Sequence, residues 1–114
     1  MIKPSKIPLA QNPTPLQIIK FEGKNFFIKR DDLTGCELSG NKVRKLEYLL
    51  YDAKKTNADI IFTCGGDQSN HARAATIAAK KIGLNTKLFL WGKKTSSVNG
   101  NLFLNKMYNA EIRY

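Results

Sequence analysis

ADIIFTCGGDQSNHARAATIAAKKIG, residues 58–83, is the stretch that decides the fold. It begins with an apolar run over residues 58–63, which predicts a buried strand. Two glycines then turn the chain, and the alanine-rich segment that follows predicts a helix that ends near Ile82. Ser69 can cap the start of this helix, and Gly83 can end it in the left-handed conformation. A strand, a tight turn and a helix in this order form part of a βαβ unit.

The flanking segments continue the alternation of strand and helix. Upstream, a helix is predicted to begin near Asn41 and to stop at Asn57, because Val43, Leu46, Leu49, Leu50 and Ala53 follow helical spacing. Downstream, residues 86–91 predict a strand, residues 99–108 a helix with Asn109 as a left-handed cap, and residues 111–114 the start of another strand. This order predicts an α/β, three-layer αβα fold around a mostly parallel sheet.

The N-terminal residues predict a different kind of structure. Four prolines within residues 1–15 exclude a regular helix and indicate an extended arm. The sequence leaves open whether this arm packs on the rest of the protein or is a loose tail. Residues 16–21 and 26–29 are short apolar runs around a polar turn, a pattern that is typical of a hairpin.

The length of 114 residues allows one domain with a modest core. A sheet of about three parallel strands is small, however, and its last strand would present an unprotected edge. We therefore expect the chain to be a piece of a longer polypeptide. We expect residues 1–53 to contain the arm, the hairpin and the first helix, and residues 54–114 to form βαβ units that are incomplete.

The charge and the cysteines bear on the functional class. The formal net charge is +10, but the lysines are scattered and mostly occur in pairs beside predicted turns, so we expect no nucleic-acid partner. The chain has no apolar signal-peptide region and no segment long enough to span a bilayer, so we expect no membrane association and a cytoplasmic location. Cys36 and Cys64 do not form a metal motif, and Cys64 is predicted to be a small buried thiol at the end of a strand.

Two charged clusters could be functional or structural. The helix that begins near Asn41 carries Lys42, Arg44 and Lys45 in its first turn, where cations oppose the helix dipole. Such a violation tends to mark a functional site, although solvated surface lysines remain an alternative. Asp31 and Asp32 could form a metal or acid–base pair, but local turn capping and ion pairing are the favoured interpretation.

The segment around Gly65-Gly66 is the other candidate site. It follows a predicted strand, and ligands in open α/β sheets lie beyond the carboxyl ends of the strands. The N–H groups near Ser69 could bind an anion at the helix start. A plain turn with a serine cap is the alternative, and the segment lacks the Gly-Lys-Ser/Thr ending of a P-loop.

Two motifs together resemble a known family. Asn41-Lys42 with Arg44–Glu47, followed by CGGDQSNHAR at residues 64–73, is similar to the D-cysteine desulfhydrase / 1-aminocyclopropane-1-carboxylate deaminase family. These are pyridoxal 5'-phosphate (PLP) enzymes of the tryptophan-synthase-β fold type, fold type II, and commonly homodimers. The resemblance runs from about Pro13 to Tyr114 and covers the first third of such an enzyme. It implies that residues 1–53 are part of the large domain and that residues 54–114 are an incomplete small domain.

The resemblance implies roles for five residues. Lys42 matches the catalytic lysine that binds the PLP aldehyde covalently, and Asn70 matches the residue that hydrogen-bonds the phenolic oxygen of the cofactor. Ser69 matches a catalytic hydroxyl close to the substrate. The segment from Gln68 to His71 would bind the carboxylate of a small amino-acid substrate. No metal is implied, and the glycine-rich loop that binds the cofactor phosphate would lie downstream of this chain.

The resemblance also implies the reaction. A D-cysteine desulfhydrase converts D-cysteine to pyruvate, sulfide and ammonia, whereas the deaminase opens a cyclopropane ring and yields 2-oxobutanoate. His71 favours the desulfhydrase, because deaminases of the family usually carry glutamine at this position. Asp67 departs from the apolar residue of many relatives and leaves the outer wall of the pocket undefined. A non-catalytic fragment or binding module is the alternative, since the phosphate-binding loop is missing.

Overall fold

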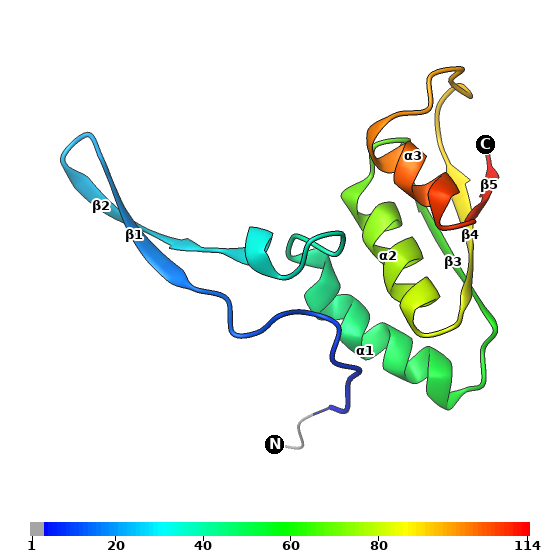
Figure 1. The fold of residues 1–114 in the computed structure, drawn as a ribbon, viewed down its shortest axis with the longest axis horizontal. Coiled ribbons are helices and arrows are strands. Elements are labelled where there is room, and N and C mark those ends of the chain that lie inside the picture. The colour runs from blue at the N-terminus through cyan, green and yellow to red at the C-terminus, as the bar shows by residue number, and fades with distance from the viewer. Residues whose placement is uncertain (1–3) are drawn as a thin grey trace.

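The structure, a computed structural model, describes residues 4–114, so the first three residues of the predicted arm lie outside it. A hairpin projects from one side, and helix α1 connects it to an α/β unit (Figure 1). In chain order the elements are β1 (Leu16–Phe21), β2 (Lys24–Lys29), a 3-10 turn (Asp31–Leu33), α1 (Lys42–Lys55), β3 (Ile60–Gly65), α2 (Asn70–Lys81), β4 (Asn85–Leu90), α3 (Gly100–Met107) and β5 (Glu111–Arg113).

The α/β unit contains a parallel three-stranded sheet in the order β3-β4-β5. Helix α2 connects β3 to β4 and packs on both strands, while α3 connects β4 to β5 and packs beside α2 (Figure 1). Thr63 pairs with Leu88, and Leu88 with Ile112, which sets the register across the sheet. The predicted α/β class and the parallel sheet are therefore confirmed.

The helices cover one face of the sheet. Because strand side chains alternate between the two faces, every second residue of a strand points toward the helices. Leu88 and Leu90 of β4 are buried against Ala72 of α2 and Leu102 of α3. The alanines of α2 allow it to lie close to the strands. A second cluster joins α2 to α1 through the buried side chains Val43, Leu46, Leu50, Ala74, Ala75, Ile77 and Ala78.

The opposite face of the sheet is open at its centre. Phe62 and Phe89 are both exposed on it and meet edge to face with ring centroids 6.0 Å apart. Cys64 lies two residues after Phe62 on the same face and is also exposed. The prediction that Cys64 is a buried thiol is wrong, because no helix of residues 4–114 covers this side of β3.

The helix ends follow the sequence signals closely. The Ser69 hydroxyl accepts a hydrogen bond from the Ala72 amide at 3.1 Å and caps α2, as predicted. Gly83 follows α2 with a φ of 79°, and Asn57 and Asn109 follow α1 and α3 with φ of 56° and 58°. The start of α1 differs, because Asn41 occupies the cap position without a side-chain hydrogen bond.

The described part of the N-terminal arm is fixed on α1 rather than loose. The Glu47 side chain is only 2 % exposed and accepts hydrogen bonds from the amides of Leu9 and Ala10, both at 3.0 Å. Lys6 forms an ion pair with the same carboxylate. The Ile7 amide donates to the Glu47 carbonyl at 2.9 Å, so one glutamate binds four residues of the arm.

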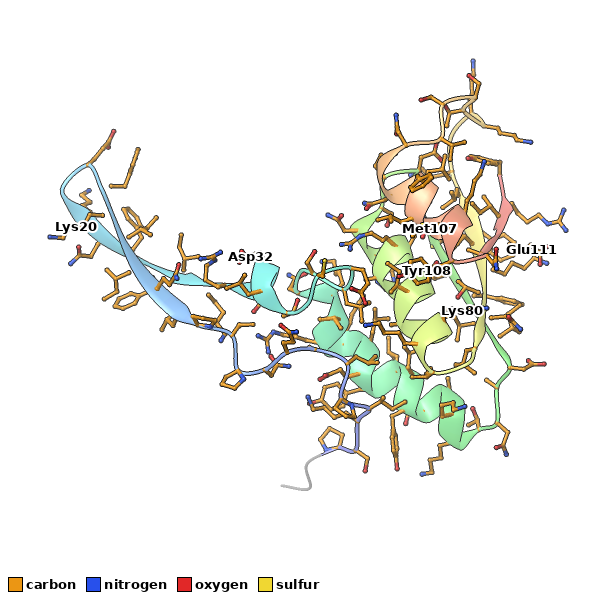
Figure 2. The ribbon with its side chains drawn as sticks, in the orientation of Figure 1. Lys20, Asp32, Lys80, Met107, Tyr108 and Glu111 are labelled. Carbon is orange, nitrogen blue, oxygen red and sulfur yellow. The ribbon has the colours of Figure 1, made fainter. Side chains whose placement is uncertain are left out.

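The predicted hairpin is confirmed, with Leu16 opposite Lys29 at its base. Its side chains are exposed on both faces, including the large apolar residues Leu16, Ile18, Phe21, Phe26 and Phe27. Figure 2 shows Lys20 near its tip and Asp32 where it joins the rest of the structure. None of the helices within residues 4–114 is both long and apolar enough to cross a bilayer.

Candidate active site

Lys42 and Asn70, the two residues expected to contact PLP, line one cleft of about 510 Å³. Lys42 is the first residue of α1, and Asn70 is the first residue of α2. The two helices pack against each other, which brings their N-terminal ends to the same place. The cleft is completed by Lys29, Asp31, Asp32, Ser39, Gly40, Asn41 and Arg73.

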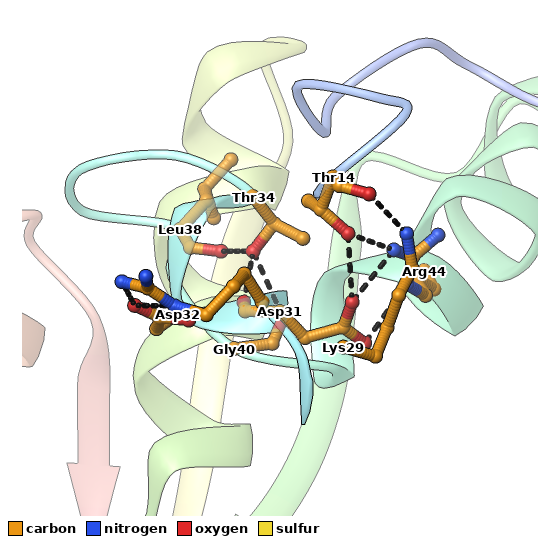
Figure 3. A network of polar contacts seen from close by, with 9 residues as sticks. Thr14, Lys29, Asp31, Asp32, Thr34, Leu38, Gly40 and Arg44 are labelled. Atoms are coloured by element: carbon orange, nitrogen blue, oxygen red, sulfur yellow. Dashed lines mark hydrogen bonds and ion pairs between the residues drawn. The ribbon is translucent and has the colours of Figure 1, made fainter. Parts of the chain in front are cut away.

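The loop before Lys42 is held by a polar network (Figure 3). The Gly40 amide donates to the Asp31 carbonyl at 2.8 Å. The Thr34 hydroxyl lies 2.9 Å from the Asp31 carbonyl and 3.1 Å from the Gly40 carbonyl. Because Thr34 is fully buried, these bonds fix the backbone two residues before the lysine.

The Asp31 carboxylate is the other half of this network (Figure 3). It accepts two hydrogen bonds from Arg44, at 3.0 and 2.7 Å, and one from the Thr14 hydroxyl at 3.2 Å. The Arg44 guanidinium holds the pKa of Asp31 below its usual range, although partial burial opposes this. Asp32 pairs instead with Arg30 two residues earlier, as the favoured interpretation of local pairing expects. Asp31, in contrast, forms an ion pair with Arg44 of α1.

These pairs also explain the cations at the start of α1. Arg44 turns toward Asp31 and is neutralised there, whereas Lys45 is exposed. The hydrogen bond to Asp31 raises the pKa of Arg44 most, and the nearby charge of Glu47 adds to this, although the Glu47 carboxylate is itself paired with Lys6 of the arm. Lys42 is therefore the cation of this first turn that lines the cleft.

Arg73 was not singled out by the sequence analysis, yet it joins the two sides of the cleft. It is 7 % exposed, and its guanidinium donates to the carbonyls of Glu37 and Ser39, the latter at 3.1 Å. These carbonyls belong to the loop that leads to Lys42, while Arg73 itself follows Asn70 on α2. A lone arginine in a helix gives no sequence signal that its partners are carbonyls 34 to 36 residues earlier.

Ser69 lies beside the cleft as the cap of α2. Its oxygen accepts from the Ala72 amide, so its hydroxyl proton stays free to donate to another group. The approach of β3 to this cap requires a glycine, because a Cβ atom on Gly65 would lie 2.6 Å from the Cβ and Oγ atoms of Ser69. The Gly-Gly turn therefore sets the position of the serine.

The Gln68 side chain points to α3 rather than to the cleft. Its Nε2 atom lies 3.1 Å from Asn99 Oδ1, and its Oε1 atom accepts from the Asn101 amide at 2.9 Å. The side-chain nitrogen of Asn101 donates to the Gln68 carbonyl at 2.8 Å and to Asn70 Oδ1 at 2.9 Å. Gln68 can therefore serve a substrate only through its backbone, and Asn101 is a contact of Asn70 that sequence analysis missed.

His71 faces away from this cleft toward an apolar pocket of about 240 Å³ between α1, β3 and α2. Leu46 and Phe62 line the same pocket. Burial lowers the pKa of His71, and the positive charges of Lys45 and Lys42 lower it further. The imidazole is therefore neutral at pH 7, and in the described structure its buried Nδ1 atom has no hydrogen-bond partner.

The residues at the cleft fit the cofactor that the motifs imply. An amine on Lys42 can bind an aldehyde, and the amide of Asn70 can donate to a ring oxygen. The first-turn N–H groups of α2 have no intrahelical acceptors and can bind an anion such as a carboxylate. No phosphate-binding loop rich in glycine accompanies them within residues 4–114.

The chain is similar to known proteins over nearly its whole length. A Thermotoga maritima protein provisionally named 1-aminocyclopropane-1-carboxylate deaminase is 50 % identical over 94 % of this chain and 35 % of its own length. The D-cysteine desulfhydrase of Yersinia enterocolitica is 38 % identical over 94 % of this chain and 35 % of its own. The chain thus spans about a third of these relatives.

The fold is shared with solved structures. The crystal structure of an ACC deaminase homologue superposes with a TM-score of 0.87 at 43 % identity, over 97 % of this chain and 35 % of the other. The match confirms the prediction of the N-terminal part of a fold type II enzyme. The family model described as "Pyridoxal-phosphate dependent enzyme" matches residues 7–114. The chain therefore belongs to the family of pyridoxal-phosphate dependent enzymes.

Proposed function

We propose that the protein is a PLP-dependent lyase that eliminates sulfide from D-cysteine, with pyruvate and ammonia as the other products. The observation that supports the proposal is that Lys42 and Asn70, an amine and an amide donor, line the same cleft. Since the chain spans about a third of its relatives, the activity is that of the whole protein to which these residues belong.

Each side chain has a role that its contacts support. PLP, when bound, supplies an electron sink for the substrate Cα. Lys42 would bind the cofactor aldehyde through Nζ and, once released, accept the Cα proton at the same atom. Asn70 would orient the cofactor ring. Ser69 would donate its hydroxyl proton to the substrate, because the bond from the Ala72 amide uses the oxygen as an acceptor and leaves this proton free.

The substrate carboxylate would bind at the N-terminus of α2. The backbone N–H groups of Asn70 and His71 lie in the first turn, where the helix dipole favours an anion. The Gln68 side chain contributes indirectly, by fixing the turn against α3. A small amino acid fits this arrangement, since its carboxylate would reach the turn while its amine reaches the cofactor beside Lys42.

The second candidate is 1-aminocyclopropane-1-carboxylate deaminase. The names of several relatives favour it, including a bifunctional D-cysteine desulfhydrase/1-aminocyclopropane-1-carboxylate deaminase of Arabidopsis thaliana at 42 % identity. His71 favours the desulfhydrase, as argued from the sequence. The two activities are separated by their products, sulfide and pyruvate in one case and 2-oxobutanoate in the other.

The proposal is tested on the protein expressed from its complete reading frame. Borohydride reduction followed by peptide mass spectrometry should attach the PLP mass to Lys42, and D-cysteine should release sulfide faster than 1-aminocyclopropane-1-carboxylate releases 2-oxobutanoate. Lys42→Ala should abolish both, while Lys45→Ala on the exposed side of α1 serves as the matched control. Labelling of a different lysine, or sulfide release that survives in Lys42→Ala, would refute the assignment.

A further inference from the structure

The orientation of the Asn70 side chain is set by a residue on a different helix. Asn101, in the first turn of α3, donates from Nδ2 to the Gln68 carbonyl at 2.8 Å and to Asn70 Oδ1 at 2.9 Å. A backbone carbonyl can only accept, so the Asn101 atom that faces it must be the nitrogen. The Asn70 atom that meets the same nitrogen must then be an acceptor, which is its oxygen.

These hydrogen bonds determine which end of the Asn70 side-chain amide remains free for a ligand in the cleft. With Oδ1 turned to Asn101, the Nδ2 group of Asn70 lies on the other side and donates to no group within residues 4–114. Asn70 lines the cleft together with Lys42. The cleft therefore offers two free N–H protons at this point, and it selects a ligand oxygen that accepts rather than donates.

The start of α3 is fixed firmly enough to hold this orientation. Gln68 Oε1 accepts from the Asn101 amide at 2.9 Å, and Gln68 Nε2 lies 3.1 Å from Asn99 Oδ1. Gly100 allows the close approach, because it has a φ of +50° and a Cβ atom there would lie 2.4 Å from Gln68 Oε1. The turn before α2 and the start of α3 are thus joined by hydrogen bonds between side-chain and backbone amide groups in both directions.

We propose that Asn101 is a positioning residue of the PLP site, which holds the Asn70 amide with its N–H groups toward the cofactor oxygen. The proposal rests on the function proposed above for the identity of the ligand, but the orientation itself depends only on the contacts of this chain. Asn101 does not line the cleft, and it acts on the cofactor through Asn70.

Asn101→Asp gives the sharpest test, because a carboxylate of the same shape accepts where asparagine donates. Asn70 should then turn its Nδ2 group to Asp at position 101 and leave its oxygen facing the cleft. Asn101→Ala removes the contact without reversing it. Asn85→Asp, at the exposed amino end of β4, makes the same chemical change away from the site and is the matched control.

The first readout needs no cofactor. Hydrogen exchange of the Asn70 side-chain N–H groups, followed by ¹⁵N NMR and assigned through their loss in Asn70→Asp, should be slowed in Asn101→Asp but not in Asn85→Asp. The second readout is PLP affinity in the complete protein. We expect Asn101→Asp to weaken PLP binding about tenfold or more, Asn101→Ala to weaken it less, and Asn85→Asp to leave it unchanged.

The outcomes separate this proposal from the proposed function. If PLP does not label Lys42 in the unaltered protein, the proposed function fails, while the amide exchange still decides the role of Asn101. Equal Asn70 exchange and equal PLP affinity in Asn101→Asp and Asn85→Asp would overturn the positioning role. If Asn101→Asp does not fold, Asn101→Ala replaces it, and unchanged PLP affinity in that variant refutes the proposal.

Discussion

Replacing Glu47 should detach the N-terminal arm from α1, because this one buried carboxylate accepts from both the backbone and Lys6. The amides of Leu9 and Ala10 both donate to its Oε1 atom, whereas Lys6 pairs with Oε2. Glu47→Gln keeps an oxygen for the two amides and removes only the ion pair. Glu47→Ala removes both carboxylate oxygens and leaves two part-buried amide donors unpaired, while the backbone bond from Ile7 remains.

The two variants should therefore lower the free energy of unfolding by different amounts. The Lys6 side chain is 33 % exposed, so solvent screens the pair, and Glu47→Gln should lower the free energy of unfolding by only about 1 kcal/mol. Glu47→Ala should lower it by about 3 kcal/mol, since two bonds to a charged acceptor are lost as well. Glu22→Gln, in the exposed hairpin turn, should change it by less than about 0.5 kcal/mol.

The effect should also depend on pH in a defined direction. Burial alone would raise the pKa of Glu47, but Lys6 and the amides of Ala10 and Leu9 outweigh it and lower the pKa. A lowered pKa means that the carboxylate stabilises the fold fully above the ordinary value of about 4.3 and loses this contribution as pH falls through the folded value. The difference between the unaltered protein and Glu47→Gln should therefore shrink in acid.

Urea unfolding followed by circular dichroism at pH 7 and in acid measures these differences, and hydrogen exchange of residues 4–15 reports the arm directly. The amides of Leu9 and Ala10 should exchange faster in Glu47→Ala than in Glu47→Gln. Equal stabilities for the two variants, or slow arm exchange in Glu47→Ala, would show that the carboxylate does not hold the arm.

Two further substitutions test the supports of the cleft. Gly65→Ala should destabilise the fold by about 1–3 kcal/mol, because its Cβ would meet Ser69 at 2.6 Å, whereas Gly66→Ala has 3.5 Å to Trp91 and should be tolerated; urea unfolding compares them. Arg73→Lys replaces two separate guanidinium nitrogens, each bound to one carbonyl, with a single nitrogen and should speed amide exchange in residues 36–41, with the exposed Arg113→Lys as the control. Exchange in Arg73→Lys that matches the control contradicts the bridging role.

The elements could be predicted because their signals are local. Apolar spacing located the helices, and Ser69, Gly83 and Asn109 stand at the helix ends where their backbone preferences predict them. The site residues were assigned differently, through the resemblance of two motifs to a known family, because the residues alone left a structural interpretation open at both. The structure places Lys42 and Asn70 on one cleft.

Long-range contacts and face coverage could not be predicted. The partners of Glu47 and Arg73 lie 34 to 41 residues away, and no periodicity encodes which of several polar groups will meet. Cys64 was misjudged because an apolar strand does not reveal whether both of its faces are covered. Asn101 was missed since an asparagine at a helix start is usually a cap, and only the fold brings it to Asn70.

The hydrogen bonds of Asp31 connect the projecting hairpin to the loop before Lys42 and to α1. The Asp31 carboxylate is bound to α1 through Arg44, its carbonyl accepts from the Gly40 amide, and the residue itself lies two positions after the end of β2. A tilt of the hairpin would therefore shift the backbone beside Lys42 rather than being absorbed by a loose hinge. A partner that contacts the exposed apolar residues of the hairpin would therefore act on the position of the loop that precedes Lys42.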